Sequence, residues 1–254
     1  MGKYDGFLIC SDIDGTLAVN GEVPHNNVEA IRRFQENGGT FVIATGRDYD
    51  YIDIFKDRFY PDKYIISGNG NVLYNTEKKL VEEVFVLDEK AEEVAICAFN
   101  EFEERLLGMD ICGPDGRIRY TREKDNAFRK LEGKICKIVY AADSEETAGR
   151  IKDYLKKDYD EDYEIRFGWN TGIEFWSKGA GKERMVRTLR EKLPDIHTII
   201  CAGDTESDIP MFKEADISYA PKDAFDEAKQ AADIVGVNCM DGLIEQIVND
   251  LDKK

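Results

Sequence analysis

The chain has 254 residues, of which 52 are acidic and 35 are basic, so its formal charge at pH 7 is −17. This charge argues against nucleic acid and anionic membrane surfaces as partners, because both attract Lys and Arg side chains. The length suits one large domain or a core with an inserted module, and 42% hydrophobic residues suffice for a substantial core. An anionic substrate would be repelled by the overall field, so its site needs a cation of its own.

The six cysteines are scattered along the chain and form no C-x-x-C pair. We expect them to be reduced and buried, which is typical of a cytoplasmic protein. The first ten residues contain no long apolar segment, so we expect neither a signal peptide nor a membrane anchor. We therefore expect a cytoplasmic monomer or weak dimer.

Short apolar runs recur along the chain and predict strands that are buried on both faces, hence a parallel sheet. They lie at 7–10, 40–44, 64–67, 197–202 and 216–220. Apolar residues at helical spacing predict helices within 25–39 and 182–193. This strand–helix–strand order predicts the α/β class, with a Rossmann-like core of three layers.

Residues 83–180 follow a different pattern and predict an inserted α+β module between two parts of the core, 1–82 and 181–254. The predicted elements are a helix at 88–105, strands at 105–112 and 117–122 around a turn at 113–116, a strand at 133–142, a helix around 148–155 and a hairpin at 163–177. The tryptophans of this hairpin, Trp169 and Trp176, and its Arg166 are interpreted as core or hairpin-face residues.

Polar residues follow four of the predicted core strands at the point where each strand ends. They are Asp12 and Asp14 after the first strand, Thr45, Gly46 and Arg47 after the second, Asn69 after the third, and Asp204 and Asp208 after the strand at 197–202. Lys182 opens a predicted helix just before that last strand. Because ligands of open α/β sheets bind outside the carboxyl ends of the strands, we expect these side chains to converge.

Several carboxylates at one sheet edge require a counter-ion. Two of them about 4 Å apart repel by roughly 4 kcal/mol at an effective dielectric constant near 20. The chain has only two histidines, His25 and His197, which we interpret as surface or structural residues, so zinc lacks its preferred ligands. Oxygen ligands alone favour Mg²⁺.

These residues resemble the four motifs of the haloacid dehalogenase superfamily of phosphohydrolases. The stretch Asp12–Leu17 is similar to its D-x-D-G-T-L motif, and Ala44–Arg47 to its second motif. Lys182 matches the third motif, and Gly203 to Asp208 match the fourth. The large insertion is similar to the cap of the Cof-type subfamily, which selects small phosphorylated metabolites, often sugar phosphates.

The resemblance implies a role for each matching residue. Asp12 would be the nucleophile that forms an aspartyl-phosphate, and Asp14 the general acid and base, with its backbone carbonyl on the metal. Thr45 and Lys182 would stabilise the transferring phosphoryl group, and Gly46, Arg47 and Asn69 would bind phosphate or substrate. Asp204 would bind Mg²⁺ beside Asp12, with Asp208 in support.

Three positions depart from the family pattern. Ser207 stands where Asn is common, Glu183 where Gly usually follows the lysine, and Lys222 in a loop that often reads Asn-Ala. We expect the Mg²⁺-dependent hydrolysis of a phosphate ester to be intact. The three departures leave two things unassigned: the polar contacts around the phosphate, and the identity of the substrate. A phosphomutase and a phosphate-binding module without turnover are the alternatives.

Overall fold

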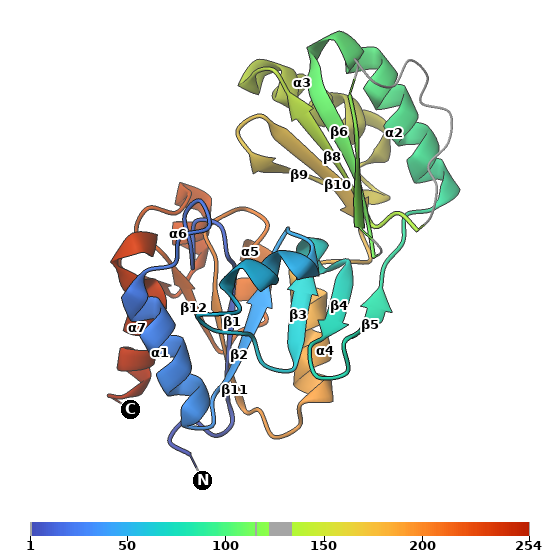
Figure 1. The fold of residues 1–254 in the computed structure, drawn as a ribbon. Helices are drawn as coiled ribbons and strands as arrows, with labels where there is room; N and C mark the ends of the chain where they lie inside the picture. The colour runs from blue at the N-terminus through green and yellow to red at the C-terminus, as the bar shows by residue number, and fades with distance from the viewer. Residues whose placement is uncertain (1, 115, 122–133, 254) are drawn as a thin grey trace. The chain divides into compact units, whose positions relative to one another are not determined.

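The structure is a computed structural model that describes residues 2–114, 116–121 and 134–253. The chain forms two compact units (Figure 1): Met1–Glu82 together with Gly181–Lys254, and Glu83–Ala180. Each unit has its own sheet. Residues 115, 122 and 133, which belong to the expected turn and strands of the insertion, lie outside the described residues.

The first unit is built on a sheet of eight strands in the order β13-β12-β11-β1-β2-β3-β4-β5. The strands are β1 (Phe7–Ser11), β2 (Thr40–Ala44), β3 (Tyr64–Ser67), β4 (Val72–Asn75), β5 (Leu80–Val84), β11 (Thr198–Ala202), β12 (Ile217–Ala220) and β13 (Ile234–Val235). Neighbours from β13 to β3 pair in parallel. The predicted parallel α/β core is therefore confirmed for these strands.

The far end of this sheet differs from the expected parallel arrangement. Strand β4 pairs antiparallel with β3, with Ser67 opposite Val72. The turn between the two strands contains the short 3-10 helix η2 (Gly68–Gly70). A connection this short cannot return the chain to a parallel start, which takes a crossover of a dozen residues or more.

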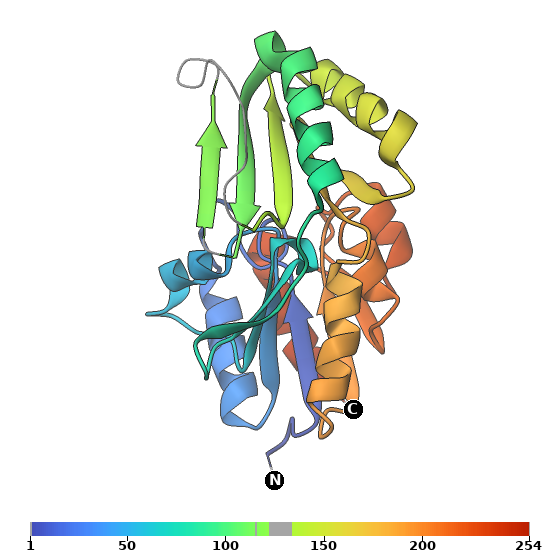
Figure 2. The same ribbon diagram turned by 90° about the vertical axis from the view of Figure 1, so that its right-hand side faces the viewer.

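Helices cover both faces of the first sheet. They are α1 (His25–Glu36), α4 (Lys182–Lys192), α5 (Ile209–Phe212), α6 (Asp226–Ala231) and α7 (Cys239–Leu251), with the 3-10 helix η1 (Tyr49–Phe55). Residues of α1 and α7 share one core cluster with Ile9 and Ile43 of the sheet. Helix α4 lies on the opposite side from α1 (Figure 2), which gives the three predicted layers.

The second unit has an antiparallel sheet of order β7-β6-β8-β10-β9 with two helices on one face (Figure 2). The elements are α2 (Glu89–Phe102), η3 (Glu103–Arg105), β6 (Leu106–Gly113), β7 (Gly116–Tyr120), β8 (Lys137–Ala142), α3 (Glu145–Tyr159), β9 (Tyr163–Trp169) and β10 (Gly172–Ser177). The predicted α+β insertion and its hairpin are confirmed. Alternate residues of the sheet, such as Ile138 and Tyr140, pack with α2 and α3 in one core cluster.

The cysteines are free, and five of the six are buried as expected. Cys97 is exposed, so the prediction was wrong at this position. The buried stripe of α2 runs through Ala91, Val94, Ala98 and Phe102, and Cys97 points away from it. None of the described helices is long and apolar enough to cross a membrane.

Candidate active site

The site begins where β1 ends. Strand β1 lies between β11 and β2, and its last residue, Ser11, pairs with Ala202 of β11. The backbone N–H of Asp12 continues this ladder, donating to the Ala202 carbonyl at 2.9 Å. Because Asp204 follows Ala202 by two residues, the parallel register brings the ends of these two strands together.

A tight turn after β1 holds Asp204. The backbone N–H groups of Leu17 and Ala18 donate to the Ile13 carbonyl, and the Thr16 hydroxyl donates to Asp204 Oδ1 at 2.9 Å. Gly15 has a φ of +88°, and a Cβ at this position would lie within 3.0 Å of Asp204 Oδ2. Only glycine adopts this conformation readily and leaves that space free.

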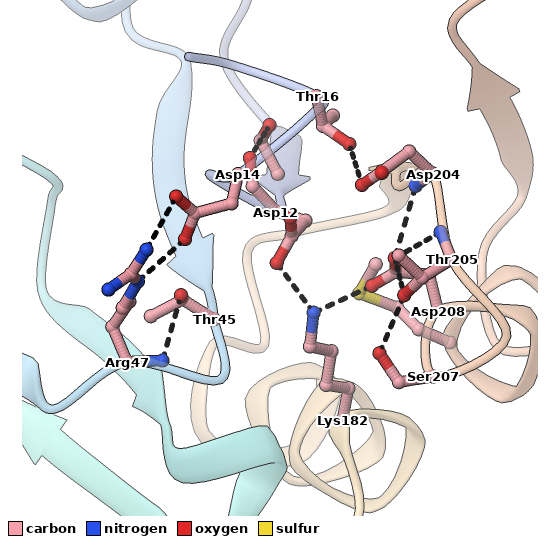
Figure 3. A network of polar contacts seen from close by, with 12 residues as sticks. Asp12, Asp14, Thr16, Thr45, Arg47, Lys182, Asp204, Thr205, Ser207 and Asp208 are labelled. Atoms are coloured by element: carbon pink, nitrogen blue, oxygen red, sulfur yellow. Dashed lines mark hydrogen bonds and ion pairs between the residues drawn. The ribbon is translucent and has the colours of Figure 1, made fainter. Parts of the chain in front are cut away.

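Lys182, the first residue of α4, lies between two carboxylates (Figure 3). Its Nζ donates to Asp12 Oδ1 at 2.7 Å and to Asp208 Oδ1 at 2.6 Å. Burial lowers the pKa of Lys182, but the charges of Asp12 and Asp208 outweigh burial and raise that pKa above its ordinary value. The lysine is therefore a fixed positive charge.

Asp208 organises the loop after β11. Its Oδ2 accepts hydrogen bonds from the backbone N–H of Asp204 at 3.1 Å, and from the N–H and hydroxyl of Thr205 at 3.0 and 3.1 Å. Its other oxygen accepts from Lys182. Asp208 precedes α5 but makes no side-chain cap to that helix, so the capping role that its position allows is not observed.

Arg47 pairs with Asp14 rather than standing alone at the end of β2. Its Nε donates to Asp14 Oδ2 at 2.8 Å and an NH2 group to Oδ1 at 3.0 Å, a two-point contact between half-exposed side chains. The guanidinium also lies over the Tyr51 ring, 4.8 Å from its centroid. Charge and stacking together fix the direction of Arg47.

Thr45 is buried behind this pair. Its hydroxyl oxygen accepts the backbone N–H of Arg47 at 3.1 Å, and its carbonyl accepts the N–H of Asn69 at 2.9 Å. Asn69 is buried with a φ of 60°, within η2. The structure thus brings Asn69 beside Thr45 through the backbone, and Gly46 connects Thr45 to Arg47.

The site has more buried carboxylates than cations: Lys182 pairs with Asp12 and Asp208, and no described basic side chain forms an ion pair with Asp204. Burial raises the pKa of Asp12 to about 7 despite Lys182, and burial, together with the charges of Asp12 and Asp208, raises that of Asp204 to about 8. Four carboxylates (Asp12, Asp14, Asp204 and Asp208) face two cations (Lys182 and Arg47), which leaves a formal charge of −2 (Figure 3). A divalent cation would neutralise that charge.

The donor atoms also fit a hard cation. One carboxylate oxygen from each of Asp12, Asp204 and Asp208 lies within 4.8 Å of the others, and all three residues are buried. Among the described residues, nothing donates a hydrogen bond to Asp12 Oδ2 or Asp204 Oδ2, whereas both Asp208 oxygens accept one. The set is all oxygen, as Mg²⁺ requires.

Two further residues belong to this network, and the sequence analysis gave neither of them a role, although Thr205 lies within the fourth motif. Thr205 bonds to Asp208 and also to Ser207, whose hydroxyl lies 2.9 Å from its own. Tyr51 supports Arg47 from η1. Each acts through a neighbour four or fewer residues away, so the local sequence contains the partners but gives no signal that they touch.

The chain matches the sequence pattern of one protein family over most of its length. Residues 9–110 and 114–247 match the haloacid dehalogenase-like hydrolases. The 5-amino-6-(5-phospho-D-ribitylamino)uracil phosphatase of Bacillus subtilis is 24% identical, over 94% of each chain. A phosphoglycolate phosphatase of Sulfurisphaera tokodaii is 27% identical, over 96% of this chain and 95% of its own.

Solved structures show the same fold. A HAD/COF-like hydrolase from Plasmodium vivax superposes with a TM-score of 0.82 at 21% identity, over 100% of this chain and 97% of its own. A haloacid dehalogenase-like hydrolase from Bacillus subtilis gives a TM-score of 0.79 at 21% identity, over 95% and 98% of the two chains.

Proposed function

Because the chain belongs to the haloacid dehalogenase-like hydrolase family, we propose that it is a phosphatase acting on monoesters of small phosphorylated metabolites. The observation that carries the proposal is the placement of Lys182 between Asp12 and Asp208, next to Asp204. It pairs a carboxylate nucleophile with a fixed cation for the transferring group. The names of relatives that span nearly the whole chain, all phosphatases, support this reading.

In the proposed reaction the Asp12 carboxylate attacks phosphorus. A bond forms between the Asp12 oxygen and phosphorus, the bond from phosphorus to the ester oxygen breaks, and Asp14 gives that oxygen its proton. Asp14 then takes a proton from water, which attacks the aspartyl-phosphate, releasing phosphate and restoring Asp12. Two displacements thus replace one hydrolysis.

Nearby groups hold the phosphoryl oxygens. Lys182 is fully charged and aimed by two carboxylates, so it can neutralise charge without rearranging. The Thr45 hydroxyl accepts from Arg47, which leaves its proton to donate to a phosphoryl oxygen. When Arg47 turns to phosphate, Asp14 is released from its ion pair and can carry a proton.

Asp12 and Asp204 would hold Mg²⁺ with the backbone carbonyl of Asp14, and Asp208 would support the site through Lys182 and the Asp204 backbone. Bound Mg²⁺ supplies positive charge to the phosphoryl group and the surrounding carboxylates. The protein would contribute two buried carboxylate oxygens, Asp12 Oδ2 and Asp204 Oδ2, which accept no hydrogen bond from the described residues and could bind the ion.

The finer assignments are also proposals. The unit formed by 1–82 and 181–254 would be the catalytic core, and 83–180 a cap that selects substrates, acting in a cytoplasmic monomer or weak dimer. Sugar phosphates are the proposed substrates. The names of the relatives differ in substrate, from phosphoglycolate to a phosphorylated ribityl compound and pyridoxal phosphate, so the choice among them needs a substrate panel.

The decisive experiment measures phosphate release from p-nitrophenyl phosphate and a sugar-phosphate panel, with Mg²⁺ or with EDTA. Hydrolysis should require Mg²⁺ and vanish in Asp12→Asn. Full activity in EDTA, or in Asp12→Asn, would overturn the proposed reaction. Isomer formation without phosphate release would instead identify a mutase.

Asp14→Asn tests the proton transfer separately. General acid–base help is typically worth about 10²–10⁴-fold, so a residual rate is expected. This residual should be largest for p-nitrophenyl phosphate, whose leaving group scarcely needs a proton, and smallest for a sugar phosphate. Equal losses for both esters would remove the acid role from Asp14.

A further inference from the structure

Asn71, the residue that follows η2, is a buried asparagine with no role in the reaction proposed above. Its side chain is fully buried, and its Nδ2 donates to the carbonyl oxygen of Gly68. Its Oδ1 accepts no hydrogen bond from the described residues. Because a buried amide oxygen without a donor lowers stability, stability alone is a weak reason for an asparagine at this position.

The hydrogen bond from Asn71 holds one peptide group of the turn. The Gly68 carbonyl belongs to the peptide between Gly68 and Asn69, and the N–H of this same peptide donates to the Thr45 carbonyl at 2.9 Å. Because a peptide group is planar, a bond that fixes the direction of its oxygen also fixes the direction of its N–H. Asn71 therefore acts on Thr45 through a single rigid unit.

This peptide would lower its strain by turning over. Asn69 has a φ of +60°, a left-handed conformation that is unfavourable for a residue with a Cβ. Rotation of the peptide by half a turn would bring that φ to a negative value and point the Asn69 N–H away from Thr45. The backbone N–H of Asn71 also donates to the Gly68 carbonyl, at 3.3 Å, but the side chain makes the shorter contact.

The same turn also holds the backbone of Arg47. The Gly68 N–H and the Ser67 hydroxyl both donate to the Arg47 carbonyl, at 3.0 and 2.9 Å. Both ends of the loop 45–47 are thus bonded to consecutive residues around the turn. These bonds use backbone atoms of Gly68, which an alanine at that position would keep.

We propose that Asn71 is a positioning residue for the loop 45–47. This inference rests on the proposed function, which assigns that loop to phosphate. By holding the peptide between Gly68 and Asn69, Asn71 keeps the Thr45 hydroxyl ready to donate to a phosphoryl oxygen without rearrangement. Asn71 itself contacts neither the phosphate nor the metal nor the leaving group.

Asn71→Ala removes the side-chain bond to Gly68 and tests this role. It should lower kcat about ten- to a hundredfold, because a small displacement of a group that binds the reacting atoms has an effect of this size. The loss should be equal for p-nitrophenyl phosphate and for a sugar phosphate. The Mg²⁺ concentration for half-maximal activity should stay the same, since Asp12 and Asp204 lie outside the loop 45–47.

Asn75→Ala is the matched control, since Asn75 is a buried asparagine of the same unit. Its side chain bonds to Glu82 and to the backbone N–H groups of Glu77 and Lys78. Urea unfolding should therefore show a larger loss of stability in Asn75→Ala than in Asn71→Ala, whereas only Asn71→Ala should lower kcat. A merely structural role would give the same order for both measurements.

Asn71→Leu provides a second variant if Asn71→Ala does not fold. Leucine keeps the branched shape of the side chain and removes both the donor and the open acceptor, so kcat should fall in the same direction. Unchanged kcat in a folded Asn71→Ala or Asn71→Leu protein would overturn the proposal. An equal loss of kcat in Asn75→Ala would also overturn it.

Phosphate binding separates this inference from the proposed function. Calorimetric titration with inorganic phosphate in Mg²⁺ needs no turnover, and Asn71→Ala should weaken binding about tenfold, whereas Asn75→Ala should leave it unchanged. A chain that hydrolyses no ester but shows this difference would overturn the proposed function and keep the role of Asn71. A chain that neither hydrolyses an ester nor binds phosphate would overturn both.

Discussion

At the scale of single residues, Asp204 and Asp208 lie in one loop but differ in the hydrogen bonds that their carboxylate oxygens accept. Asp204 has an oxygen free of hydrogen bonds beside Asp12, whereas both oxygens of Asp208 accept from Lys182 or the loop backbone. The first arrangement suits a metal ligand. The second suits a residue that positions Lys182.

Substituting each aspartate by Asn should therefore separate metal binding from catalysis. Asp204→Asn should raise the Mg²⁺ concentration for half-maximal activity by about tenfold or more, because it removes a ligand charge. Asp208→Asn should lower kcat by about 10- to 100-fold with a smaller change in that Mg²⁺ concentration. The measurement is p-nitrophenyl phosphate hydrolysis across a Mg²⁺ titration.

A surface aspartate provides the control for these two variants. Asp226 is exposed and pairs only with Lys229 among the described residues, so Asp226→Asn should change neither parameter. If Asp208→Asn shifted the Mg²⁺ titration as far as Asp204→Asn, Asp208 would be a direct ligand.

The sequence predicted which residues gather at the site but not how they pair. Strand ends and family motifs identify Asp12, Lys182 and Asp204 without a structure. The pairing of Arg47 with Asp14 depends on a turn that begins 33 residues before Arg47. Such contacts depend on the three-dimensional path of the loops, which cannot be predicted from the spacing of residues along the chain.

At the scale of elements, the turn η2 supports the start of α4. Gly70 has a φ of +90°, and a Cβ there would lie within 3.0 Å of the Gly181 carbonyl and the Lys182 backbone N–H. These are backbone atoms, which cannot turn aside as a side chain can. Close approach of the two elements thus requires glycine at position 70.

Gly70→Ala should accordingly displace the first turn of α4 and with it the Lys182 side chain. We expect the unfolding free energy to fall by at least about 1–3 kcal/mol, because of backbone strain at positive φ and the clash of the new Cβ with Gly181 and Lys182. We also expect a lower kcat. Urea unfolding and p-nitrophenyl phosphate kinetics measure the two effects.

Gly68→Ala is the matched control in the same turn. Its φ is +57°, and the nearest atom to a new Cβ would be 3.7 Å away, an ordinary contact. It should show only the cost of the left-handed conformation, about 1 kcal/mol, with little change in kcat. Equal effects of the two variants on kcat would show that the contact with α4 does not position Lys182.

Most core elements could be predicted because their pattern is local. The runs at 40–44 and 64–67 coincide with β2 and β3. Helix α7 was not predicted. Gly242 in its first turn has a φ of 102°, and the backbone N–H groups of Ile244 and Glu245 donate to the side-chain oxygen of Asn27 in α1. A helix start supported by a residue more than 200 positions away leaves no local signal.

At the scale of the whole molecule, charge is distributed unevenly. The chain carries −17, yet the candidate site contains Lys182 and Arg47, the two cations that we propose bind the phosphate. The same site leaves its four carboxylates with only two cations in the metal-free chain, and burial raises the pKa of Asp12 and Asp204. That deficit makes the stability of the whole protein depend on pH and on Mg²⁺.

The metal-free protein should lose stability as the pH rises from 5 to 8. The pKa values of Asp12 and Asp204 are raised in the folded chain to about 7 and about 8, chiefly by burial, from 3.8 when unfolded. Raised folded pKa values give stability that is fully present below the unfolded pKa and is lost as the pH rises toward the folded pKa. The loss is at most about 1.4 kcal/mol per pH unit for each group.

Magnesium should reverse this dependence, because it binds the ionised carboxylates of the folded chain and not the protonated ones. At a Mg²⁺ concentration 100 times its dissociation constant, the gain is about 2.7 kcal/mol, and it should be larger at pH 8 than at pH 5. Urea unfolding in EDTA and in Mg²⁺ at both values measures it, with Asp204→Asn as the control that halves the slope in EDTA. A slope in EDTA that is flat, or that Asp204→Asn leaves unchanged, would show that these two buried carboxylates do not set the pH dependence of folding.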